Sequence, residues 1–153
     1  MNNQKELGLL NDLIRINNDR IEGYQKASEN LKGDNNNLRD LFGSLQTESE
    51  QNNKQLTGEI KHLGGSPDTG TTTGGKVYRT WMDVKATFGG NDPKSILESC
   101  ERGEDAAKKA YQTVLESGDL SDNITAVIAN QQERQLQAHD RIKALRDQWQ
   151  HND

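Results

Sequence analysis

Four stretches of this 153-residue chain space their apolar residues by three, four and seven positions, as an amphipathic helix does. That spacing predicts long helices over residues 4–32, 36–63, 93–117 and 121–150. A helix with one narrow apolar stripe has to bury that stripe against another element. We therefore expect an all-α protein in which residues 1–153 form one four-helix-bundle domain.

Polar residues interrupt the apolar stripes. Asn17 falls on the stripe of the first helix, and Glu104 lies close to the apolar face of the third. The stripe of the second helix runs through Leu38, Phe42, Leu45, Ser49, Asn52, Leu56, Ile60 and Leu63. A carboxylate such as Glu104 can bind a metal ion there, pair with a cation, or reach solvent.

The composition excludes several classes of function. A net charge of −5 argues against nucleic-acid binding, which depends on clustered lysines and arginines. Acidic and basic residues are interspersed, and no apolar run approaches the roughly 20 residues of a membrane span, so we expect no membrane partner. The single cysteine, Cys100, and an N-terminal sequence without a signal-peptide core favour a cytoplasmic location.

A long connection joins the second and third helices. Its first part is rich in Gly, Ser and Thr, and its second part, residues 77–88, has the spacing of a short helix. A long crossover at this place, with short turns elsewhere, is the ferritin-like arrangement of a four-helix bundle. Trp81 and Phe88 of the short helix are candidates for an interaction surface. Packing of this helix on its own bundle is the favoured interpretation, and formation of a homodimer stays open.

The two halves of the chain repeat one another. When Tyr24 is aligned with Tyr111, Asn17 is paired with Glu104. About the same shift pairs Glu50 with Leu136 and Asn53 with His139. Two similar helical hairpins related by a pseudo-twofold axis would produce this repeat, as in a ferritin-like bundle.

Several strings together resemble a bacterial family of ferritin-like four-helix-bundle proteins of unknown function. The strings are LNDLIRINNDRIEGYQKA, HLGG, TWMDVKA, SCERGEDAAKKAY and AHDRIKALRD. The resemblance covers nearly the whole chain. It implies the ferritin-like fold and a bacterial cytoplasmic setting, and it brings no established activity or cofactor.

Di-iron bundles of this superfamily take a Glu from each of two helices and a Glu-x-x-His motif from each of the other two. The corresponding positions here are Asn17, Glu50 with Asn53, Glu104, and Leu136 with His139. Asn17, Asn53 and Leu136 differ from the Glu and His ligands expected there, and Leu136 cannot coordinate a metal at all. We therefore do not expect a dinuclear iron centre. Glu50, Glu104 and His139 could still hold a single Fe, Mn or Zn ion.

The favoured interpretation is a buried layer of ion pairs in place of a metal. Arg20 lies one turn beyond Asn17, and a guanidinium can satisfy two carboxylates. The expected layer comprises Asn17, Arg20, Glu50, Asn53, Glu104 and His139. We therefore expect a non-enzymatic bundle with a binding or structural role, which fold analogy connects to bacterial stress, and we assign no catalytic residue. The alternative is a metalloprotein with one mononuclear site.

Overall fold

The computed structural model describes residues 3–70 and 92–151, which contain four helices. The helices are α1 (Gln4–Asn30), α2 (Asn36–His62), α4 (Pro93–Glu116) and α5 (Asp122–His151). Each begins and ends within two residues of the predicted bounds. The fold is an all-α four-helix bundle, as the spacing of the apolar residues predicts. The short helix expected over residues 77–88, with Trp81 and Phe88, lies outside the described residues.

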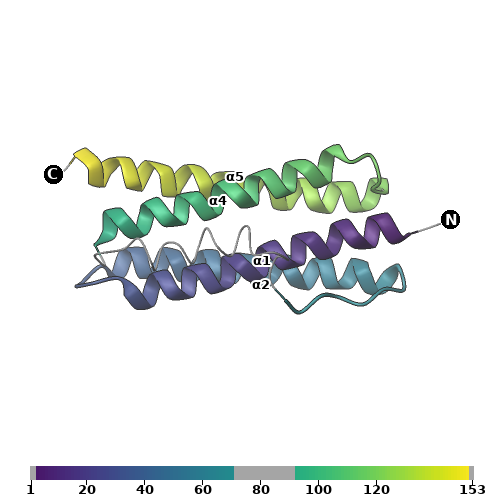
Figure 1. Ribbon diagram of the computed structural model, residues 1–153, viewed down its shortest axis with the longest axis horizontal. Helices are drawn as coiled ribbons and strands as arrows, with labels where there is room; N and C mark the ends of the chain where they lie inside the picture. The colour runs from purple at the N-terminus through teal and green to yellow at the C-terminus, as the bar shows by residue number, and fades with distance from the viewer. Residues whose placement is uncertain (1–2, 71–91, 152–153) are drawn as a thin grey trace.

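The bundle consists of two helical hairpins, α1 with α2 and α4 with α5, that lie side by side along its length (Figure 1). Helix α2 ends at one end of the bundle and α4 begins at the other, as a long crossover between them requires (Figure 1). The hairpins meet mainly through α1 and α4, whereas α2 and α5 contact each other far less. Among the helices that the structure describes, α2 and α5 are thus the most weakly packed neighbours.

Local sequence signals fix the helix ends. Asp92 precedes α4, and its side chain accepts a hydrogen bond of 2.9 Å from the backbone N–H of Ser95, while Pro93 occupies the first turn. Gly33 and Gly118 stand after α1 and α4 with φ of 75°, a conformation that glycine adopts without a steric penalty. These turns fold each hairpin back on itself.

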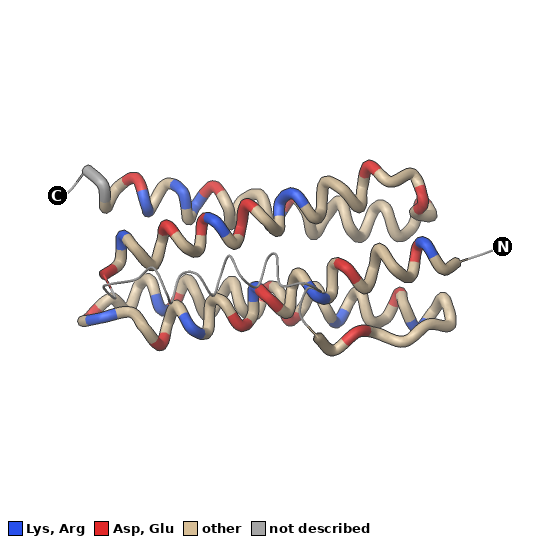
Figure 2. Tube along the Cα trace, viewed as in Figure 1, with Lys and Arg blue, Asp and Glu red and all other residues tan. Residues whose placement is uncertain are grey.

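Two apolar clusters form the core. One contains side chains near the α1–α2 turn, such as Phe42 and Leu97, and the other contains side chains toward the opposite end, such as Leu10 and Ile60. Acidic and basic residues are interspersed along the helices (Figure 2). None of the helices described by the structure is long and apolar enough to cross a bilayer.

Candidate functional site

A layer of buried polar side chains separates the two apolar clusters. Its members are fully buried, with 0% of their surface exposed: Asn17, Arg20, Ser49, Asn52, Glu104, Gln131 and Gln135. All four helices contribute to this layer. Burying so many polar groups costs free energy unless they bond to one another.

Arg20 and Glu104 form the centre of the layer. Nε of Arg20 donates to Oε1 of Glu104 at 2.9 Å, and Nη2 donates to Oε2 at 3.0 Å. The same guanidinium donates to Oγ of Ser49 at 2.9 Å and to Oε2 of Glu48 at 3.0 Å. Burial by itself lowers the pKa of the guanidinium, but the negative charges of Glu104 and Glu48 outweigh it and raise that pKa. Arg20 is therefore a permanent cation at the centre of the bundle.

The carboxylate of Glu104 receives further donors. The hydroxyl of Tyr24 donates to its Oε2 at 2.6 Å, and Nε2 of Gln135 lies 3.4 Å from its Oε1. The same Nε2 also donates to the backbone carbonyl of Glu104 at 2.9 Å. Burial, and then the charge of Glu104, raise the pKa of Tyr24, so this hydroxyl stays protonated and remains a donor.

A neutral network extends from the ion pair toward Tyr111. Nδ2 of Asn17 donates to the hydroxyl of Tyr111 at 2.9 Å, and that hydroxyl donates to Oε1 of Gln131 at 2.8 Å. Nδ2 of Asn52 donates to Oδ1 of Asn17 at 3.1 Å. Burial raises the pKa of Tyr111 to about 12. This part of the layer is thus uncharged.

The hydrogen bonds reproduce the internal repeat. The sequence alignment pairs Tyr24 with Tyr111 and Asn17 with Glu104. In the structure, Tyr24 of the first hairpin bonds to Glu104 of the second, and Tyr111 of the second hairpin bonds to Asn17 of the first. Each tyrosine therefore contacts, in the opposite hairpin, the residue at the aligned position 17 or 104. The two contacts are related as a pseudo-twofold axis would relate them.

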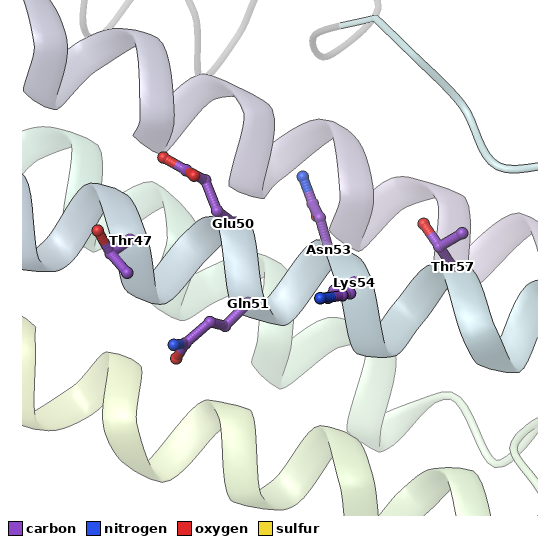
Figure 3. A pocket seen from close by; sticks show the side chains of 6 residues that line it. All are labelled: Thr47, Glu50, Gln51, Asn53, Lys54 and Thr57. Carbon is purple, nitrogen blue, oxygen red and sulfur yellow. The ribbon is translucent and has the colours of Figure 1, made fainter.

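The structure corrects the prediction for α2 by one residue. Glu50 is exposed rather than buried, and Asn53 is half-buried and donates to Oδ1 of Asn18 on α1 at 2.8 Å. Figure 3 shows both side chains extending from α2 toward α1 rather than toward α5. The interior positions are Ser49 and Asn52, one residue earlier in each case. The apolar stripe of this helix includes Ser49 and Asn52, so the spacing of the stripe predicts the interior positions better than the alignment of the two halves does.

His139 lies at the α4–α5 contact rather than beside Glu104. Its Nε2 is 2.5 Å from Oδ1 of Asp105, and its Nδ1 is 3.1 Å from Oδ1 of Asp140. Thus the structure does not bring the predicted ligands Glu50, Glu104 and His139 together. Over residues 3–70 and 92–151, no group of three or more His, Cys, Asp or Glu side chains is arranged to hold a metal ion.

Comparisons with known proteins agree with this fold. A family model described as "Domain of unknown function (DUF2383)" matches residues 5–117. A crystal structure described as "ferritin like, diiron-carboxylate proteins from Bacillus anthracis str. Ames" aligns with a TM-score of 0.71 and 19% sequence identity. The alignment covers 95% of this chain and 98% of that chain, and it shows that this chain has the ferritin-like fold. No curated protein matches the chain.

The residues of the buried layer do not fit a di-iron centre. Such a centre needs carboxylate and imidazole ligands from all four helices. Within this layer Glu104 is the only carboxylate, and Asn17, Ser49, Asn52 and Gln135 are neutral. The guanidinium of Arg20 bonds to both oxygens of Glu104 and would repel a divalent cation.

Proposed function

This chain belongs to the DUF2383 family of domains of unknown function, and from that premise we propose that it is a non-enzymatic binding or structural protein. The observation that carries the proposal is the pair of Arg20 with Glu104 at the centre of the bundle. In ferritin-like di-iron proteins this region holds the ligands of the metal ions. Here an internal cation neutralises the carboxylate, so the layer stabilises and orients the two hairpins without a bound ion.

We propose further that the protein works in the bacterial cytoplasm. The lone cysteine, Cys100, is buried and free, which suits a reducing compartment. A connection to bacterial stress rests on analogy with other ferritin-like proteins, and a homodimer is the simplest assembly for such a bundle.

Elemental analysis tests the proposal against its alternative, a mononuclear Fe, Mn or Zn site. The protein is purified without chelators and incubated anaerobically with Fe(II), Mn(II) or Zn(II), beside Glu104→Ala and the surface control Glu133→Ala. We expect the wild type to contain no more bound metal than Glu104→Ala, and we expect added metal not to raise its melting temperature. The reason is that Arg20 already bonds to both carboxylate oxygens of Glu104. Near-stoichiometric metal that is lost in Glu104→Ala alone would replace the proposal with the metalloprotein.

A further inference from the structure

A polar cleft lies between α2 and α5, the pair of neighbouring helices that pack together most weakly among those described. Its volume is about 390 Å³, within the range of small-molecule sites. It is lined by Ser44, Thr47, Glu48 and Gln51 of α2 and by Arg134 of α5. Figure 3 shows Gln51 directed from α2 toward the side of α5. Every lining side chain can donate or accept a hydrogen bond.

Arg134 provides a cation in this cleft whose hydrogen bonds are incomplete. Its Nε is buried and has no hydrogen-bond partner. Its Nη2 makes one long contact, 3.4 Å to Oδ1 of Asn52. In the part of the chain that the structure describes, no carboxylate forms an ion pair with Arg134. A buried donor without an acceptor costs about 1–3 kcal/mol, so an acceptor from a ligand would be favourable here.

Glu48 provides the opposite charge. Its Oε2 accepts a hydrogen bond from Nη2 of Arg20 at 3.0 Å, and 19% of its side chain is exposed. Among the described contacts, no donor reaches its Oε1. The cleft therefore offers an acceptor on Glu48 and a guanidinium donor on Arg134, with hydroxyl and amide groups between them.

The charges that line the cleft balance without a ligand. Arg134 carries one positive charge and Glu48 one negative charge, and the other lining side chains are neutral. An ion with a charge of one sign could pair with only one of these two residues. A ligand that carries both charges would pair with Arg134 and Glu48 and keep the sum at zero.

From this arrangement we propose that the cleft binds a small zwitterion of the α-amino acid class. The carboxylate of the ligand pairs with the guanidinium of Arg134, and its ammonium group pairs with Glu48. Ser44, Thr47 and Gln51 surround the rest of the ligand. This inference rests on the binding role proposed above and names the chemistry of the ligand.

Calorimetric titration of the full chain tests the proposal. The twenty common amino acids are compared with acetate, which has the carboxylate alone, and with methylamine, which has the ammonium group alone. We expect at least one amino acid to bind about tenfold or more tightly than either fragment. Arg134→Gln should weaken that binding about tenfold or more, and Glu48→Gln should weaken it as well. Arg141→Gln, an exposed arginine on the same helix, should bind like the wild type.

Several results would overturn the proposal. One is that no amino acid binds at concentrations up to about 10 mM, and another is that Arg134→Gln binds as the wild type does. Binding that is equal for acetate and for the amino acid, and unchanged in Glu48→Gln, would also reject a zwitterion. Gln51→Trp, whose indole ring would occupy the cleft without removing a charge, should abolish the binding, and it provides a second test if Glu48→Gln loses its fold. Failure of these titrations would leave the metal analysis unaffected, so the two proposals are tested separately.

Discussion

Arg20 of α1 and Glu104 of α4 join the two hairpins through two hydrogen bonds of 2.9 and 3.0 Å between fully buried side chains. The pair lies at the α1–α4 interface, where the hairpins meet and where Tyr24 also bonds to Glu104 and Asn17 to Tyr111. A buried ion pair is stable only when further hydrogen bonds satisfy both partners, and here Ser49, Glu48 and Tyr24 supply them. Disruption of one partner should therefore be much more costly than removal of both.

Arg20→Leu should lower the free energy of unfolding by about 3–5 kcal/mol, because it leaves the carboxylate of Glu104 buried without its cation. Urea denaturation monitored by circular dichroism measures the change. Arg141→Leu, at an exposed position of α5, should change stability by no more than about 0.5 kcal/mol. Equal losses in the two variants would show that burial of the pair is not important for stability.

Arg20→Leu combined with Glu104→Leu should be more stable than Arg20→Leu alone, because both charges are then absent from the interior. The same denaturation experiment provides the comparison, with each single variant as its control. A double variant that loses the sum of the two single losses would contradict a direct interaction between the two side chains.

The sequence predicted the helices well because the apolar spacing persists over 24 to 30 residues in each one. Asn17 and Glu104 could be found because a repeated tyrosine marks the same place in both hairpins. The error on α2 arose because Glu50 was located by a shift between the halves, which is uncertain by one residue. One residue turns a helix by about 100°, which is enough to move a side chain from the interior to the surface.

The partners of the buried groups were harder to predict. The sequence placed His139 with Glu104, but Asp105 and Asp140 are its neighbours in the structure. Which of several nearby carboxylates a histidine contacts depends on the rotation of α5 against α4, and the low amphipathicity of α5 fixes that rotation poorly. The role of Arg134 in a cleft could not be predicted either, since it depends on how far α2 and α5 are apart.

Tyr24→Phe should cost about 1.5–3 kcal/mol, because it removes a 2.6 Å hydrogen bond to an ionised and buried acceptor. Thermal and urea unfolding measure the loss. In a Glu104→Leu background the same change should cost less than about 0.5 kcal/mol, since the acceptor is already absent. An equal cost in both backgrounds would assign the effect of Tyr24 to packing rather than to this hydrogen bond.

Glu6 connects the start of α1 to the start of α5. Its Oε2 accepts a hydrogen bond of 2.6 Å from the backbone N–H of Ser121, and only 7% of the residue is exposed. A negative charge beside a helix N-terminus is favourable. Glu6→Gln should therefore cost about 0.3–1 kcal/mol and Glu6→Ala about 1–2 kcal/mol. Urea denaturation measures both, and an unchanged stability in Glu6→Ala would contradict the role of this contact.

His139 provides a pH-dependent contact between α4 and α5. Its ring nitrogens face Asp105 and Asp140, so both nitrogens can donate only when the imidazole is protonated. Burial and the charge of Lys108 act to lower the pKa of His139, but the hydrogen bonds to Asp140 and Asp105 outweigh them and raise it. The charged form is thus stabilised by folding.

Because the pKa of His139 is raised in the folded state, its contribution to stability is fully present below its unfolded pKa of about 6.5 and is lost as pH rises through the folded pKa. We therefore expect wild type to exceed His139→Gln in free energy of unfolding by about 1 kcal/mol at about pH 5.5, and by much less at about pH 9. Urea denaturation at both pH values measures the difference. Arg141→Gln, at an exposed position of α5, is the control and should match the wild type in stability at both pH values. A difference between wild type and His139→Gln that grows with rising pH would mean that folding favours the neutral imidazole, and that Asp105 and Asp140 do not hold its proton.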